Sequence, residues 1–94
     1  MDDNIVKSDI VIPIRGRDQG ALMMVIDRLS DGYLLLADGR LRKIEHPKRK
    51  KDKHVRFVAH TDCRAALKLR NGEKLSNSEI RRAIADAANP PLTE

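Results

Sequence analysis

The first part of the chain alternates short apolar runs with glycine-containing turns. The apolar runs lie at residues 9–14, 21–29 and 33–37, and the turns are Asp31-Gly32 and Asp38-Gly39. Glycine takes positive φ without steric cost and Asp tolerates it, so such steps are typical of type I′ turns between antiparallel strands. The pattern therefore predicts a small antiparallel sheet.

Residues 21–29 are apolar on both faces, which suits a strand inside a curled sheet. A buried helix has the same pattern, but the short length and the β-branched Val25-Ile26 pair favour a strand. Residues 40–44 and 55–58 are predicted to be two further strands. We expect the last strand to return beside the first and close a small barrel, with Phe57 in its core.

The first strand contains Pro13, which has no backbone N–H, so this strand belongs at an edge of the sheet or carries a bulge. The loop at residues 15–20 follows, and its two glycines permit a close approach of backbone. Residues 1–8 are expected to be a loose, flexible lead-in from which Ile5 and Val6 dock on the sheet.

Beyond Thr61 the apolar spacing changes to that of helices. Thr61 or Asp62 is predicted to cap a short helix that runs through Leu69. Asn71-Gly72 then supplies a left-handed stop.

A second helix is predicted after the capping-box sequence Ser76-Asn77-Ser78-Glu79, and Asn89-Pro90-Pro91 ends it. Its apolar residues fall on one stripe, formed by Ile80, Ala83, Ile84 and Ala87. We expect this stripe to pack on the sheet; an exposed stripe would instead imply a partner or a dimer.

The predicted fold class is mostly β with appended α. The predicted organisation is a lead-in at residues 1–8, a barrel at 9–60 with a basic arm at 48–54, a helical hairpin at 61–89 and a tail at 90–94.

Charge is concentrated in one segment of this 94-residue chain, which carries a net charge of +5. Between Lys48 and His54 the only acidic residue is Asp52. Such a local field favours a polyanionic partner. The run has no apolar residue to bury, so it is predicted to be a solvated arm or long loop when unbound.

The remaining composition points to a cytoplasmic protein. The single cysteine, Cys63, allows no disulfide within the chain, as expected in a reducing compartment. The acidic start at residues 1–4 lacks the basic region of a signal peptide, and no apolar run approaches the ~20 residues that span a bilayer.

No enzymatic motif is present: the chain lacks a phosphate-binding P-loop, a dinucleotide-binding loop and a nucleophile elbow. His60 and Cys63 lie three residues apart, but a zinc site needs about four ligands at suitable spacing. We therefore expect no enzyme activity, no metal and no cofactor, with Cys63 a small buried residue on a helix.

The loop at residues 15–20, with Gly20 at the central glycine position, and the apolar run 21–26 resemble the KOW motif. Residues 35–51, 71–74 and 77–81 extend this resemblance to the small bacterial KOW-domain RNA-binding proteins, which are similar to KOW-type large-subunit ribosomal proteins of archaea and eukaryotes. The resemblance covers about residues 9–88. Pro13 and Ile14 depart from it, because such proteins usually have more polar residues there.

This resemblance implies an SH3-like barrel that binds structured RNA, most naturally ribosomal RNA, and a role on or near the ribosome in translation. The candidate RNA-binding residues are Arg15, Arg17, Gln19, Gly20, Arg40, Arg42, Lys43, Lys48, Arg49, Lys50, Lys51, Lys53 and His54.

Each group of candidates also has a plainer interpretation. The basic run either contacts phosphates or only keeps the protein in solution. The loop at residues 15–20 either admits RNA backbone beside its glycine or is an ordinary turn. Arg40, Arg42 and Lys43 either extend the RNA surface or pair with Asp38 or Glu45.

Tyr33 and Phe57 are the only aromatic residues apart from histidine, which is too few for a typical single-strand binder. We expect recognition of duplex or folded RNA by shape and backbone, by a monomer. The alternative is a protein–protein adaptor of the transcription or translation machinery, because SH3-like barrels serve many functions.

Overall fold

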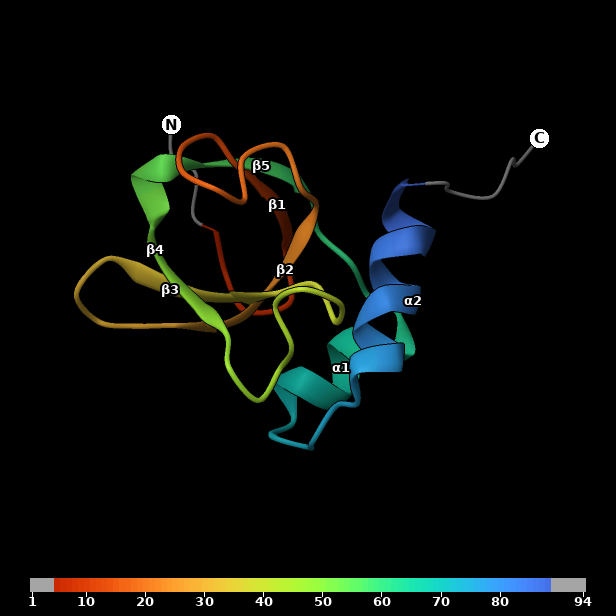
Figure 1. The fold of residues 1–94 in the computed structure, drawn as a ribbon. Helices are drawn as coiled ribbons and strands as arrows, with labels where there is room; N and C mark the ends of the chain where they lie inside the picture. Colours follow the sequence, from red (N-terminus) through yellow and green to blue (C-terminus); the bar gives the residue numbers. More distant parts are fainter. Residues whose placement is uncertain (1–4, 89–94) are drawn as a thin grey trace.

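The computed structural model describes residues 5–88. They form a five-stranded antiparallel sheet followed by two helices (Figure 1). The elements are β1 (Ile10–Pro13), β2 (Met23–Arg28), β3 (Tyr33–Ala37), β4 (Lys48–Lys51), the 3-10 turn η1 (Asp52–His54), β5 (Val55–Ala59), α1 (Arg64–Arg70) and α2 (Asn77–Ala88). The predicted fold class, mostly β with appended α, is confirmed.

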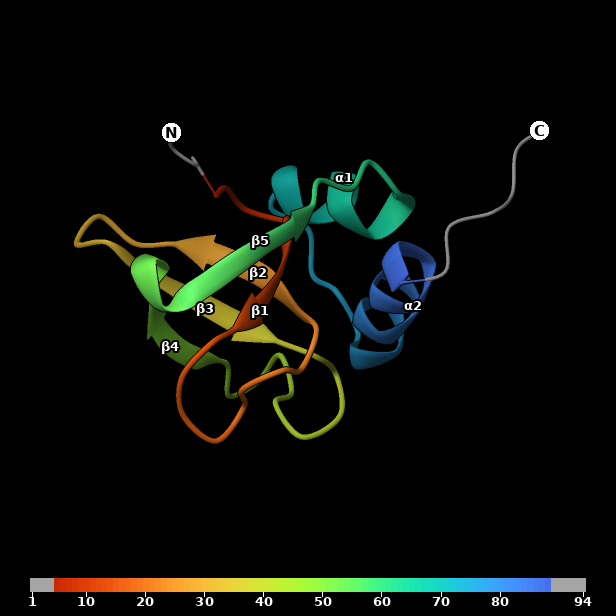
Figure 2. The same ribbon diagram turned by 90° about the horizontal axis from the view of Figure 1, so that it is seen from above.

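The strands lie in the order β4-β3-β2-β1-β5, so β4 and β5 are the two edges of the sheet. This order is compatible with an SH3-like barrel, but the sheet does not close, and η1 joins its two edge strands. Both helices lie on one side of the sheet, away from the β2–β3 hairpin (Figure 2).

The central strands bury apolar side chains on both faces, because successive residues of a strand point to opposite sides. The interior of the curled sheet contains Ile5, Val11, Met23, Val25, Leu34, Leu36 and Val55. The opposite face meets the helices through Ile10, Met24, Ala37, Ala65, Ala66, Leu69, Leu75, Ile80 and Ala83. Apolar character on both faces of residues 21–29 therefore did indicate a strand within a curled sheet.

The segment before β1 is packed against the sheet, so the expectation of a loose lead-in is wrong for the part described. Ile5 is buried in the interior core as predicted, whereas Val6 is exposed. Ser8 is fully buried with a positive φ of 79°, and its N–H donates to the carbonyl of Val25 at 2.7 Å. The Ser8 hydroxyl accepts a 3.0 Å hydrogen bond from Arg70 on α1.

Asp9 is also fully buried, and its carboxylate is satisfied from two directions. One oxygen accepts the N–H of Val6 at 2.9 Å, and the other lies 2.6 Å from Nδ1 of His60. A buried carboxylate is tolerated only with such partners. Asp9 therefore links the segment before β1 to the chain that follows β5.

The expected edge position of β1 is wrong, because β1 lies between β2 and β5. The alternative expectation, a bulge, is found, although at Ile10/Val11 rather than at the proline. Pro13 is the last residue of the strand, where its missing N–H costs least, and its carbonyl accepts the N–H of Gly20 at 3.0 Å.

β5 pairs with β1 as predicted. Val55 is buried, but Phe57 is 39% exposed, so the expectation that Phe57 lies in the core is wrong. Its ring packs edge-on against His60, with centroids 4.9 Å apart. The reason is that β5 is an edge strand, flanked by another strand on one side only.

The Asp-Gly turns are not of the predicted type I′, which requires positive φ at both central residues. Within residues 5–88 the only non-glycine residue with positive φ is Ser8, so only Gly32 and Gly39 take left-handed backbone in these turns. The first turn still joins β2 to β3, with the N–H of Leu29 donating to the carbonyl of Tyr33 at 2.8 Å.

The strand predicted at residues 40–44 is wrong, because this segment is a loop. The Asp38 carboxylate accepts the backbone N–H groups of Arg40 and Arg42, each at 2.9 Å, and so removes them from any strand ladder. Leu41 is 88% exposed, so no apolar face forms.

The loop at residues 38–47 is fixed by α2 instead. The Asn77 side chain accepts the N–H of Ile44 at 2.8 Å and donates to the Glu45 carboxylate at 3.0 Å. The latter bond lowers the pKa of Glu45 below its usual value. Arg81 donates to the carbonyl of Gly39 at 2.7 Å.

The N-terminus of α1 differs from the prediction. Cys63, half-buried, is the N-cap residue and makes no side-chain capping bond. Thr61 and Asp62, the expected caps, bond instead to the carbonyl of Ser8 and to the guanidinium of Arg70.

The predicted stop of α1 is confirmed. Gly72 has a positive φ of 80°. Its N–H donates to the carbonyl of Leu69 at 3.1 Å, and the N–H of Glu73 donates to the carbonyl of Lys68 at 2.9 Å. These two bonds are those of a Schellman motif.

The predicted capping box of α2 is confirmed: the N–H of Glu79 donates to Ser76 Oγ at 3.1 Å, and the N–H of Ser76 donates to the Glu79 carboxylate at 2.9 Å. The apolar stripe is structural, as expected, because Ile80 and Ala83 are buried against the sheet and α1, while Ile84 and Ala87 are partly buried beside them. The predicted helix stop at residues 89–91 lies outside the described residues.

Gly39→Ala tests the contact between the loop and α2. A Cβ on Gly39 would overlap the carbonyl oxygen of Asn77 and press on Arg81, and the residue has φ 78°. Gly32→Ala is the matched control, because Gly32 also has positive φ but has no atom within 4 Å of an added Cβ. We expect Gly32→Ala to lower the free energy of unfolding by about 1–2 kcal/mol, and Gly39→Ala by about 1–3 kcal/mol more. Equal losses in urea denaturation would contradict the contact.

Candidate nucleic-acid interface

The basic run is a strand, so the expectation of a solvated arm at residues 48–54 is wrong. Lys48–Lys51 forms β4, which pairs antiparallel with β3, and Asp52–His54 forms η1. The facing pairs are Leu36–Lys48, Leu35–Arg49, Leu34–Lys50 and Tyr33–Lys51. The run needs no apolar residue of its own because β3 supplies partners for its backbone, and lysines on an edge strand prevent edge-to-edge pairing of molecules.

The cationic side chains of β4 alternate between two opposite faces of the sheet. Lys48 and Lys50 lie across from Leu36 and Leu34, whose side chains are in the interior core, and both lysines are partly buried. Their aliphatic stems can cover apolar surface while the ammonium groups reach water. Arg49 and Lys51 occupy the other face and are exposed. The run is therefore not one continuous cationic surface.

Lys50 also holds the glycine loop in place. Its ammonium donates to the carbonyl of Arg15 at 2.9 Å, beside Gly16. The N–H of Ile14 donates to the carbonyl of His54 at 2.9 Å, which holds η1 beside the start of the same loop. The start of the loop at residues 15–20 and the end of the basic run, which are far apart in the sequence, are thus brought together.

Several cations meet around His54. Partial desolvation, and then the charges of Arg15, Lys51, Lys50 and Lys53, lower the pKa of His54 below its usual value of 6.5. Cations gathered in this way mark a place where an anion would be stabilised.

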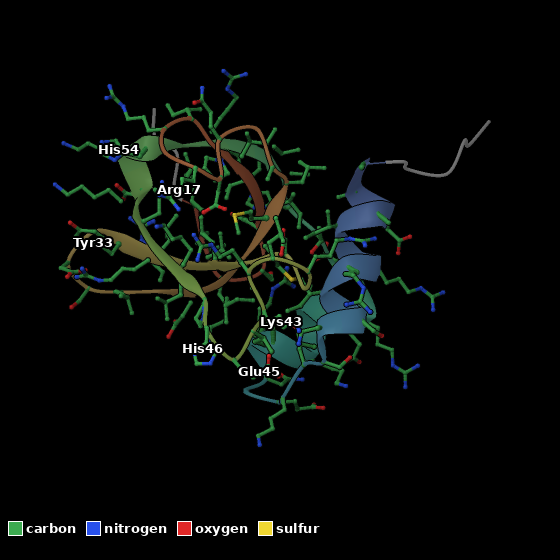
Figure 3. The ribbon with its side chains drawn as sticks, in the orientation of Figure 1. Arg17, Tyr33, Lys43, Glu45, His46 and His54 are labelled. Atoms are coloured by element: carbon green, nitrogen blue, oxygen red, sulfur yellow. The ribbon has the colours of Figure 1, made fainter. Side chains whose placement is uncertain are left out.

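The remaining candidates, Arg40, Arg42 and Lys43, form a second group on the loop at residues 38–47. Figure 3 places Arg17 and His54 at one end of the sheet and Lys43, Glu45 and His46 at the other, beside the helices. The candidates therefore extend over the surface from one end of the sheet to the other.

Within this second group Arg42 is paired. Its Nε lies 3.2 Å from the Asp18 carboxylate, an ion pair across to the glycine loop rather than to the expected Asp38 or Glu45. Arg40 and Lys43 are exposed. Arg42 is therefore a positioning residue for the two loops, and Arg40 and Lys43 are the candidates for phosphate contact.

Gln19 and Gly20 are exposed on the glycine loop, and nothing lies within 4 Å of a Cβ built on Gly20. A shallow hollow of about 390 Å³ adjoins this loop, the loop at residues 38–40 and α2, and Arg81 lines it. Nothing in the sequence indicates Arg81, because its place beside Gly20 depends on how α2 packs on the sheet.

A second feature missed from the sequence lies on the outer face of β3 and β4. The Arg49 guanidinium lies 3.7 Å above the centre of the Tyr33 ring and 2.7 Å from the Asp31 carboxylate, and the Lys51 ammonium is 5.8 Å from the same ring. The two-residue period of strands would have put these residues on one face, had residues 48–51 been expected to form a strand.

The part of the chain that the structure describes contains no group of three or more His, Cys, Asp or Glu that could hold a metal ion. None of the helices in this part is long and apolar enough to cross a membrane. Comparison with models of known protein families and with curated protein sequences found no match.

The field around His54 can be tested by NMR titration. Arg15→Gln removes the charge that lowers the pKa of His54 most, so we expect this pKa to rise toward 6.5. Arg40→Gln is the matched control, because Arg40 is not among the charges that act on His54, and it should leave the His54 titration unchanged. An unaltered titration in Arg15→Gln would contradict the cluster.

The lowered pKa of His54 also predicts how the stability of the protein changes with pH. The folded protein holds the pKa of His54 below its usual value of 6.5, so the unfolded chain binds this proton more readily. Well above pH 6.5 neither state binds this proton, so His54 does not change the stability there. As the pH drops through that value the unfolded chain takes up the proton first, and the free energy of unfolding falls. Replacing His54 by Gln should flatten this part of a denaturation series measured between about pH 8 and pH 5.

Proposed function

We propose that this chain is a non-enzymatic RNA-binding module that recognises folded RNA mainly through its phosphates. The observation that carries the proposal is the set of cations around His54, held by the β4 ladder and by the bond from Lys50 to Arg15. Cations that are already fixed in place around His54 attract a polyanion, and binding then needs no loss of entropy to order a flexible arm.

The surrounding loops support the same proposal. Arg17 is exposed at the same end of the sheet as His54, and Gln19 and Gly20 are exposed on the same loop as Arg17. The open space at Gly20 would admit a nucleic-acid backbone. Arg40 is exposed and lines the hollow beside Gly20, and Lys43 is exposed at the other end of the sheet from His54, which suits a ligand that extends over the surface. RNA with secondary structure is such a ligand.

The KOW resemblance makes structured ribosomal RNA the first class of RNA to test, and we propose a setting in translation on or near the ribosome. We also propose a cytoplasmic location, which the single cysteine supports. The protein–protein adaptor has less support, because the α2 stripe that would serve it is packed against the sheet and α1.

A charge-removal series tests the proposal. The triple variant Arg15→Gln, Arg17→Gln and Lys53→Gln should weaken binding to a ribosomal RNA hairpin in a filter-binding assay. Each lost phosphate contact reduces the slope of log affinity against log salt by about 0.7–0.9, so the slope should become shallower by about 2–3.

The matched control removes the same charge from the helical side, with Arg64→Gln, Lys74→Gln and Arg82→Gln, which are also exposed residues. This variant should keep the wild-type slope. Equal weakening by both triple variants would mean that net charge alone acts, and the corner around His54 would then not be the site. Absence of any complex between the wild-type protein and folded RNA at low ionic strength would overturn the proposed function.

A further inference from the structure

The Arg49 guanidinium is held over the Tyr33 ring on the outer face of the sheet. Tyr33 lies beneath it at 3.7 Å, and Asp31 binds its edge at 2.7 Å. The Arg49 side chain is nevertheless 52% exposed. Because Tyr33 covers one side of the guanidinium and about half of the side chain is exposed, the uncovered side of Arg49 is open to a ligand.

Charge on this face favours a neutral, flat ligand over a phosphate. The Arg49 charge is offset by Asp31, and Asp27 shares the same face, because Asp27 and Arg49 both pair with Leu35. An incoming phosphate therefore meets little net positive charge here. A nucleobase has no net charge, and guanidinium planes are common stacking partners for unpaired bases of RNA.

The neighbouring cations continue from this plane toward the corner around His54. Lys51 is exposed on the same face, with its ammonium 5.8 Å from the Tyr33 ring. Lys53 and His54 follow directly in η1. A nucleotide whose base lies on Arg49 would thus have its backbone beside Lys51 and the adjoining nucleotides beside η1.

We propose that the exposed plane of Arg49, supported by Tyr33 and oriented by Asp31, stacks one unpaired base of the bound RNA. This inference rests on the proposed RNA-binding function and narrows its ligand to RNA with a bulged or looped-out nucleotide.

The test uses two RNA hairpins with the same paired stem and loop, one without a bulge and one with a single added 2-aminopurine as the bulged nucleotide. The wild-type protein should bind the bulged hairpin more tightly, by on the order of fivefold to a hundredfold, and should quench the 2-aminopurine fluorescence. Arg49→Lys keeps the charge but removes the plane. It should abolish the preference and the quenching while leaving affinity for the paired hairpin within about twofold.

Two control variants define the role of the plane. Arg64→Lys makes the same substitution at an exposed residue on the helical side and should retain the preference. Tyr33→Phe keeps the supporting ring and should retain it too, and circular dichroism of each variant reports whether the sheet is intact.

The outcomes separate this inference from the function on which it rests. If Arg49→Lys binds the bulged hairpin as tightly as the wild type, or only lowers stability without changing the preference, the stacking site is wrong and RNA binding stands. If the wild-type protein binds neither hairpin at low ionic strength, the proposed function fails and this inference fails with it.

Discussion

Backbone hydrogen bonding between β3 and β4 determines what the basic run can do. Without a paired strand, four adjacent cations would repel one another and move independently. The ladder fixes them at strand spacing and alternates their side chains between two faces. One face supplies Lys50, which fixes the glycine loop, and the other supplies Arg49, which lies on Tyr33. Each cation therefore has a defined environment before any ligand arrives.

The helices contribute more than a cover for the sheet. The loop at residues 38–47 has no strand of its own, and Asn77 and Arg81 of α2 hold it by hydrogen bonds to Ile44, Glu45 and Gly39. The ion pair between Arg42 and Asp18 then connects this loop to the glycine loop. The position of the second group of cations thus depends on the packing of α2, although α2 belongs to the end of the chain.

The sequence was sufficient for features that depend on neighbouring residues. The capping box at Ser76, the stop at Gly72 and the two-sided apolar character of β2 each follow from local chemistry. It was insufficient where a distant segment supplies the partner. The run at residues 48–51 was predicted to be a solvated arm because its stabilising contacts come from β3, which is distant in the sequence. Residues 40–44 were predicted to be a strand because the prediction did not consider that the Asp38 carboxylate accepts their backbone N–H groups. The sequence predicted which residues, mostly cations, belong to the candidate site. The face of the sheet on which each one lies follows only from the register between β3 and β4.

The polar contacts around Ser8 and Asp9 make the sheet and the helices one cooperative unit. Ser8 bonds to Arg70 and to Thr61, while Asp9 lies against His60, so residues from both ends of the molecule share one buried polar junction. A cut between β5 and α1 would leave the buried Ser8 hydroxyl without Arg70, its hydrogen-bond donor on α1. Removal of α1 would therefore cost the sheet a buried polar contact as well as apolar packing.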